Sequence, residues 1–321
     1  MGGLSRKSAY VNSLRNNGID PIIIDAGDAL FEQIKYPVAK VPAEQFKAKS
    51  FLQGMEKIGC AALNIGEYDL AGGYDFIKKL EQNTSVPFVS ANLYSVETGQ
   101  PAFDPYIVIE KNDLKVGIIG VTDNLSGDIK ELYKLDYLVE GQKYIDKIRG
   151  DVDILIVLVS GMINNRDVIL NSFQKADYVF LSRTVMNTRT GNIQKADLPI
   201  FYTIGLNGKY LIEIKASIVD ESKPIMDISA YKNRIASYER QLIRLKQTKD
   251  GQTLEEKYTK NPMVLKQIEN YDKQVKELDG KIVAVINRSE CQIVPLPEAM
   301  DYDRKMQDYI DHILLETGER L

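Results

Sequence analysis

Runs of aliphatic residues that alternate with helical patterns are the feature that most limits the folds open to this chain. The most hydrophobic run is DILIVLVS at Asp153–Ser160, and PIIID at Pro21–Asp25 is another. A continuous apolar run is typical of a strand buried on both faces, as in a parallel sheet. Between such runs, Pro42–Ile58 and Arg166–Phe173 have helical spacing. The sequence therefore predicts a layered α/β domain.

Strands without an intervening helix follow in two places. Tyr106–Glu110 and Leu114–Val121 flank Lys111-Asn112-Asp113, which predicts a β-hairpin. Further along, Pro199–Gly205 and Lys209–Ile218 flank Leu206-Asn207-Gly208, and we expect them to pair as antiparallel strands. The α/β part is predicted to end near residue 220.

The last hundred residues have a different pattern. Apolar residues there step by three and four, as along the a/d seam of a coiled coil: Ile228, Tyr231, Ile235, Tyr238, Leu242 and Leu245, then Val264, Ile268, Tyr271, Val275 and Leu278. Two helices joined by a polar stretch predict an antiparallel helical hairpin. We expect short strands at KIVAVI and CQIVPL and a helix over Asp301–Glu316. The predicted parts are residues 1–220 and 221–321.

Composition excludes several classes of protein. The net charge is −4 and the pI is near 5.4, so there is no electrostatic signature of nucleic-acid binding. No apolar run reaches the length of about 18 residues that a membrane-spanning helix needs. The start MGGLSRKSAY has no apolar region typical of a signal peptide. Cys60 and Cys291 are expected to be buried apolar residues, and the only histidine, His312, lies in a helical pattern.

Polar residues follow one predicted strand directly. Ala61–Ile65 leads to Gly66 and then to Glu67-Tyr68-Asp69, before a helical pattern at Leu70–Leu80. The carboxyl ends of strands are where α/β proteins usually place their chemistry. This stretch is therefore a candidate site.

The order of these landmarks resembles a known family. The segments GGLSRKSAYVNSLR, IIIDAGDALFE, ALNIGEYDLAGGYDF, PFVSANL, KVGIIGVTD, DILIVLVSG, DYVFLS and IFYTIGLNGKYLIEI resemble the 5′-nucleotidase-like branch of the calcineurin-type metallophosphoesterases. The resemblance spans roughly residues 2–218 and implies a layered α/β/β/α sandwich. It also implies two divalent metal ions that bind phosphate and activate water. The helical tail resembles relatives associated with multihaem cytochromes.

The family's metal-binding positions can be compared with this sequence residue by residue. The resemblance places Asp28 at the metal-bridging carboxylate, and Gly66 at the glycine of the motif G-N-H-E. Glu67 then stands at the asparagine ligand and Tyr68 at the catalytic histidine. Asn92, in PFVSANL, is a further candidate binding residue.

The remaining positions also differ from the family pattern. Gly161 stands where a lone histidine is expected, and Arg183 and Val185 stand at the two histidines of G-H-x-H. The strand that carries the family's D-x-H motif would precede Gly2 and is missing from this chain. We therefore expect either an upstream segment with an export signal, or another segment or partner that fills the gap.

These differences predict a degenerate site without a confident catalytic residue. Asp28 and Glu67 are weak candidates for a hard ion such as Mg²⁺ or Ca²⁺, which prefer oxygen ligands. Without metals, facing carboxylates repel each other, and an arginine can supply the missing positive charge. We therefore expect Arg183 close to Asp28 or Glu67. The candidate binding residues are Asp28, Glu67, Arg183 and Asn92.

The sequence thus favours a pseudoenzyme without a cofactor, used for binding or assembly. Its expected partner is a protein or a second copy, through the hairpin at 228–279. An accessory role beside a multihaem cytochrome is compatible with this. The alternative is a metal-dependent hydrolase of 5′-nucleotides or other phosphate esters with two divalent ions. The resemblance implies a periplasmic or cell-surface location, with a cytoplasmic one as the alternative.

Overall fold

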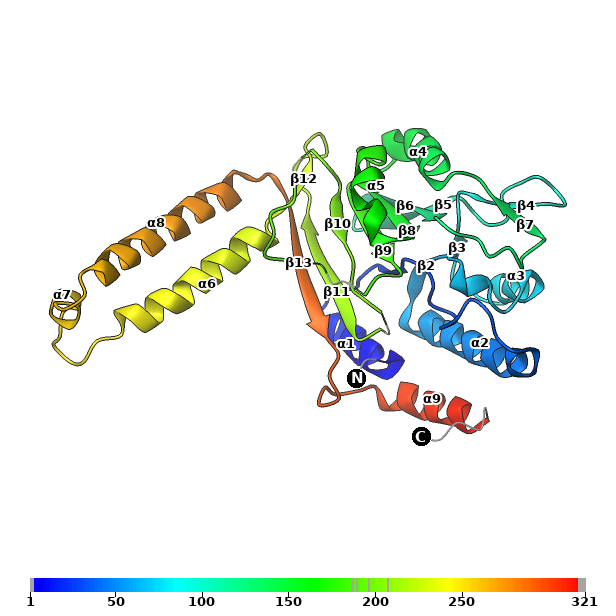
Figure 1. The fold of residues 1–321 in the computed structure, drawn as a ribbon, viewed down its shortest axis with the longest axis horizontal. Helices are drawn as coiled ribbons and strands as arrows, with labels where there is room; N and C mark the ends of the chain where they lie inside the picture. The colour runs from blue at the N-terminus through cyan, green and yellow to red at the C-terminus, as the bar shows by residue number, and fades with distance from the viewer. Residues whose placement is uncertain (1–2, 186–187, 189, 196, 207, 317–321) are drawn as a thin grey trace. The chain divides into compact units, whose positions relative to one another are not determined.

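The computed structural model describes residues 3–185, 188, 190–195, 197–206 and 208–316. Helices and strands alternate through most of the chain (Figure 1). The strands are β1 (Ile23–Asp25), β2 (Cys60–Asn64), β3 (Phe88–Val89), β4 (Leu93–Ser95), β5 (Tyr106–Lys111), β6 (Leu114–Thr122), β7 (Leu132–Lys134), β8 (Ile154–Ser160), β9 (Tyr178–Ser182), β10 (Ile200–Tyr202), β11 (Tyr210–Ser217), β12 (Ile225–Asp227) and β13 (Asn287–Pro295). The α-helices are α1 (Leu4–Asn16), α2 (Val41–Ile58), α3 (Tyr74–Gln82), α4 (Tyr137–Ile148), α5 (Arg166–Ser172), α6 (Ser229–Lys246), α7 (Leu254–Lys257), α8 (Met263–Ala284) and α9 (Arg304–Glu316).

The chain divides into two compact units. The first contains residues 1–188, 197–211 and 294–321, and the second contains residues 189–196 and 212–293. This division differs from the predicted parts because the chain returns to the first unit after the hairpin. There, α9 packs on α1, where Ser8 donates to Asp303 at 2.7 Å and Ser5 donates to Gln307 at 2.8 Å.

The first unit is built on two sheets. One has the order β1-β2-β3 with parallel pairing, and the other has the order β10-β9-β8-β6-β5. In the larger sheet β6, β8, β9 and β10 are parallel, and β5 pairs with β6 as the predicted hairpin. The amide of Asn64 on β2 donates to the carbonyl of Val121 on β6 at 3.0 Å, so the two sheets meet at their carboxyl ends. The mixed α/β fold predicted from the sequence is confirmed.

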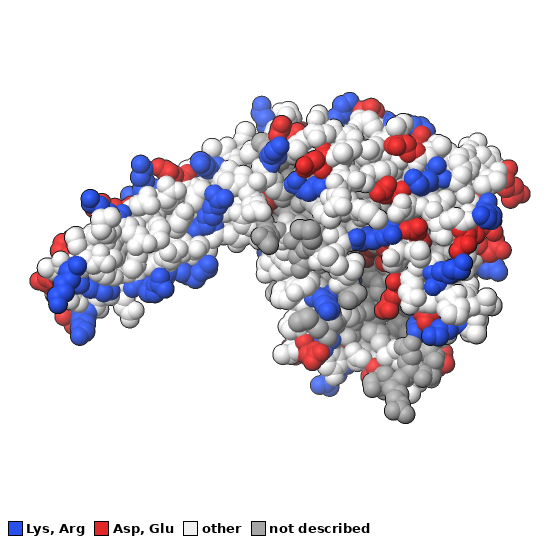
Figure 2. Space-filling model, in the orientation of Figure 1, with Lys and Arg blue, Asp and Glu red and all other residues white. Residues whose placement is uncertain are grey.

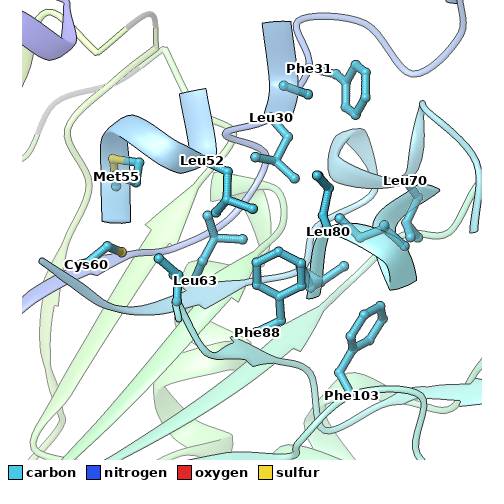
Figure 3. Packing of buried hydrophobic residues seen from close by; sticks show 14 of the residues in the cluster. Leu30, Phe31, Leu52, Met55, Cys60, Leu63, Leu70, Leu80, Phe88 and Phe103 are labelled. Atoms are coloured by element: carbon cyan, nitrogen blue, oxygen red, sulfur yellow. The ribbon is translucent and has the colours of Figure 1, made fainter. Parts of the chain in front are cut away.

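Two hydrophobic clusters cover the outer faces of these sheets. The first joins α2, α3 and the small sheet, and Figure 3 shows Leu52, Leu63 and Phe88 among its residues. The second packs α4 and α5 on the large sheet, around the fully buried Phe173 and Val157. Burial of these side chains is the main favourable contribution to the fold.

The second unit contains a pair of long helices, α6 and α8, which pack against each other (Figure 1). Their contact includes Tyr238 and Tyr271, whose ring centroids are 5.1 Å apart, and the buried residues Leu242, Ile268 and Leu278. These residues belong to the predicted a/d seam. A three-stranded sheet in the order β11-β13-β12 accompanies the helices.

Several local predictions are wrong. β10 and β11 do not pair, because β10 runs parallel to β9 and β11 lies in the sheet of β13. The run KIVAVI begins as the last turn of α8 and is not a strand, since the amphipathic pattern of the helix continues through Ala284. The predicted helix Leu70–Leu80 is divided into a 3₁₀ turn at Tyr68–Leu70 and α3, because Gly73 has a positive φ of 93°.

No helix that the structure describes has both the length and the apolar character that crossing a bilayer requires.

Candidate functional site

Asp28 lies where the carboxyl ends of both sheets meet. Its Oδ1 accepts a hydrogen bond from the N–H of Tyr68 at 2.9 Å. Its Oδ2 accepts from the hydroxyls of Ser160 at 2.6 Å and Ser182 at 3.1 Å, the last residues of β8 and β9. The backbone of Asp28 is left-handed, with φ 60°. Both carboxylate oxygens of Asp28 therefore have protein partners.

Asp69 is the centre of the hydrogen bonding around this point. It is completely buried, and its carboxylate accepts from the N–H groups of Asp28, Ala29, Leu30 and Gly66 at 2.7–2.8 Å. Burial and the charge of Asp28 raise its pKa to about 7, against the opposing effect of the N–H donors. Asp69 thus fixes the loop after β1 to the loop after β2.

Glu67 and Arg183 form an ion pair. Nη1 of Arg183 lies 2.6 Å from Oε2 of Glu67, and the two side chains are 18% and 10% exposed. The guanidinium also lies over the ring of Tyr68, 4.8 Å from its centroid. The predicted contact between Arg183 and Glu67 is therefore present. The backbone of Arg183 is left-handed, with φ 61°, which an arginine rarely adopts.

Gly66 lets these groups approach closely. A Cβ atom at this position would overlap Oδ1 of Asp28 and lie 2.7 Å from the hydroxyl of Ser160. Only glycine therefore fits between the strand end and Asp28.

Two buried asparagines bind backbone groups near the strand ends through their side-chain amides. Asn64 donates to the carbonyl of Ala26 at 2.9 Å as well as to Val121. Asn92, a predicted binding residue, exchanges hydrogen bonds with the backbone of Thr122 at 2.8 and 2.9 Å and donates to Leu135 at 3.0 Å. These bonds use the amide of Asn92 to fix backbone, and the hydrogen bonds among the described residues do not connect it with Asp28.

The other two predicted positions, Gly161 and Val185, have no polar side chain to contribute to this cluster. Gly161 is buried, and a Cβ atom there would lie 3.2 Å from Cβ of Asp123. Asp123 accepts a hydrogen bond from Asn165 at 3.1 Å, so Gly161 borders a small polar cluster. Val185 is 81% exposed and contributes no polar atom to the site.

The residues present do not fit a pair of divalent metal ions. Within the described ranges, no three His, Cys, Asp or Glu side chains are grouped so that they could hold a metal. Asp28 is fully hydrogen-bonded, Glu67 is paired with Arg183, and the guanidinium brings a positive charge to the place where metal ions would add theirs.

Sequence reasoning missed Ser160 and Ser182, and it included Asp69 in the candidate stretch without indicating its central role. Ser160 and Ser182 each end a predicted strand, so their positions could have indicated that they reach the same carboxylate. Asp69 accepts bonds from residues 39 to 41 positions upstream, and no local pattern signals such a contact.

Comparison with known proteins relates the chain to nucleotidases. The chain is 27% identical to the 2′,3′-cyclic-nucleotide 2′-phosphodiesterase/3′-nucleotidase of Yersinia enterocolitica over 131 residues, which are 37% of this chain and 20% of that protein. It is 28% identical to the 5′-nucleotidase of Vibrio parahaemolyticus over 121 residues, 37% of this chain and 21% of that protein. The chain thus spans about a fifth of the length of these curated relatives. No protein-family model matches the chain.

Solved structures show the same fold. The sulfate thiohydrolase SoxB of Thermus thermophilus has a TM-score of 0.66 at 10% identity, covering 98% of this chain and 47% of its own. The calcineurin-like phosphoesterase YfkN of Bacillus subtilis has a TM-score of 0.60 at 15% identity, covering 98% and 89%. Over about a third of its length the sequence is similar to these nucleotidases, and its fold is that of solved 5′-nucleotidase and calcineurin-like phosphoesterase structures.

Proposed function

We propose that this chain is a non-hydrolytic protein with a phosphoesterase fold, which works by binding or assembly. The observation that supports this most strongly is the ion pair of Arg183 with Glu67 at the strand ends. A guanidinium neutralises one carboxylate there, while serine hydroxyls and a backbone N–H hold Asp28. Hydrolysis of a phosphate ester by two metal ions needs free ligands for both ions, and these side chains are engaged with the protein.

The direct test is metal content together with turnover. The purified protein is assayed by elemental analysis and with 5′-AMP and p-nitrophenyl phosphate, with added Mn²⁺, Mg²⁺ or Zn²⁺ and with EDTA. The same assays are repeated on the full native polypeptide, so that any upstream segment is present. We expect no stoichiometric metal and no turnover above the buffer rate. Chelator-sensitive hydrolysis, with about two metal ions per chain, would contradict the proposal.

The hairpin of α6 and α8 is the proposed docking element for a protein partner or a second copy. Its seam is closed by Tyr238 and Tyr271, while Ile243 and Met263 are 72% and 67% exposed. Lys and Arg side chains are prominent on the hairpin surface in Figure 2. Exposed apolar residues beside arginine are typical of protein interfaces. A protein in which residues 229–284 are replaced by a short loop should lose the partner or the self-association but keep the first unit folded.

A metal-dependent hydrolase is the second candidate function. It is favoured by the names of the relatives, which are a nucleotidase and a cyclic-nucleotide phosphodiesterase over 37% of this chain. It requires an atypical metal site, with Asp28 or Glu67 released from its present partners. A periplasmic or cell-surface location and an association with multihaem cytochromes stay predictions from the family resemblance.

A further inference from the structure

We propose that Arg183 is the protein's own counter-cation for the carboxylate of Glu67, and that it makes this part of the fold independent of divalent metal ions. The inference rests on the proposed function and gives its site a physical role. Removing the charge of Arg183 should therefore make the stability of the first unit sensitive to divalent cations. The stability of the wild-type protein should not change when these cations are added.

The first support is the balance of charge. Asp28, Glu67 and Asp69 come from two neighbouring loops, and the N–H of Tyr68 and that of Asp28 link these loops through the carboxylates. Among the described residues, Arg183 is the basic side chain that forms an ion pair with one of these three acids. A buried carboxylate is unfavourable unless hydrogen-bond donors or a positive charge are close. Asp28 and Asp69 have such donors, and Glu67 has the guanidinium of Arg183.

The second support is the way in which Arg183 is held. Its guanidinium is placed between a carboxylate and an aromatic face, with Glu67 at 2.6 Å and the ring of Tyr68 centred 4.8 Å away. Both neighbours attract a cation. The guanidinium is part of the chain and only 18% exposed, so this positive charge is present without a metal ion binding from solution.

The third support is backbone strain on both sides of the cluster. Arg183 and Asp28 both have left-handed backbones, at φ 61° and φ 60°. Such conformations persist in residues other than glycine where surrounding contacts hold them. Arg183 follows β9 directly, and from this position its guanidinium reaches Glu67.

The test is a double-mutant cycle with added cations. Unfolding by urea is followed for the wild type, Arg183→Met, Glu67→Gln and the double variant. Each protein is measured in EDTA, in about 5 mM Mg²⁺ and in about 5 mM Mn²⁺. We expect wild-type midpoints to be the same in all three solutions. Arg183→Met should unfold at a lower midpoint in EDTA and recover part of the loss in Mg²⁺ or Mn²⁺. The double variant should show no such recovery.

Arg183→Lys and Arg240→Met are the matched controls. Lysine keeps the charge, so Arg183→Lys should unfold at a urea midpoint close to that of the wild type. Added cations should not change that midpoint. Arg240→Met removes a positive charge from α6 and should leave the cation response unchanged. If Arg183→Met does not fold, Arg183→Gln, which also removes the charge, replaces it in the cycle with Glu67→Gln.

The proposal is overturned if Arg183→Met and Glu67→Gln have additive effects, or if cations stabilise every variant equally. These outcomes are distinct from failure of the proposed function. Metal-dependent turnover by the wild type would contradict the proposed non-hydrolytic function, even if Arg183 and Glu67 are energetically coupled. Absence of that coupling would contradict only the role of Arg183 and would not change the turnover result.

Discussion

The strand ends around Asp69 and the helical hairpin of α6 and α8 are held together in opposite ways. At the strand ends, one buried carboxylate gathers backbone N–H groups from residues about 40 positions away. In the hairpin, residues repeated every three or four positions form a seam between two helices. The first region depends on single polar contacts between distant segments, and the second on a distributed apolar pattern. Damage should therefore be abrupt in the first region and graded in the second.

The largest effect is expected for Asp69→Ala. Alanine has no acceptor for the four N–H groups that now bond to the carboxyl group, and unpaired buried donors are costly. We expect the free energy of unfolding of the first unit to fall by about 3–5 kcal/mol, measured by urea unfolding. The control, Asp167→Ala, changes a side chain that is 85% exposed and should be nearly neutral. A loss below about 1 kcal/mol would show that Asp69 is not the centre of this region.

The next effect is expected for Leu278→Ala in the hairpin. Leu278 is 5% exposed, and truncation of a buried leucine costs about 2–4 kcal/mol. Because the hairpin is a separate unit, hydrogen exchange should rise in α6 and α8 and stay unchanged in β6 and β8. Faster exchange in the large sheet would mean that the two units unfold together, and the comparison would fail.

A smaller effect is expected from pH. The pKa of Asp69 is raised to about 7 in the folded protein, and its ordinary value is 3.8. Between these values the folded state keeps a proton that the unfolded state releases, so stability falls as pH rises towards 7 and then levels off. We expect the urea midpoint of the first unit to fall as the pH rises from 5 to 7.5. Stability that increases with pH over this range would contradict the raised pKa.

The smallest effect is expected for Lys246→Ala. Its ammonium lies 2.7 Å from Asp272, but both side chains are more than 40% exposed. Exposed ion pairs contribute about 0.5 kcal/mol or less. Hydrogen exchange at the distal end of the hairpin should therefore change little. An effect as large as that of Leu278→Ala would show that charges, and not the seam, hold the hairpin.

The sequence allowed the elements with a local or periodic signal to be predicted. Ile154–Ser160 is a fully buried strand, as its continuous apolar run indicates, and the seam residues Leu242 and Leu278 are buried between the paired helices. The proximity of Arg183 to Glu67 was predictable because the family resemblance aligned both positions with one site. Charge compensation then supplied the physical reason.

What the sequence could not show depends on distant contacts. Nothing around Asp69 indicates that its partners are Ala29 and Leu30. The return of α9 to α1 rests on contacts between residues about 300 positions apart, such as Ser5 with Gln307. The separation of β10 and β11 into different sheets was missed because the turn signal between them is local, while their pairing partners are not.

The place where the second unit joins the first has a consequence for engineering this protein. After a first short passage through the second unit at residues 189–196, the chain leaves the first unit again after Leu211 and re-enters it at Val294. Close to both of these points the N–H of Leu296 donates to the carbonyl of Lys209 at 2.9 Å. Exit and return are thus neighbours, as at the base of an inserted domain. We therefore expect that the helices of this segment can be shortened or exchanged in engineered variants without altering the strand order of the two sheets in the first unit.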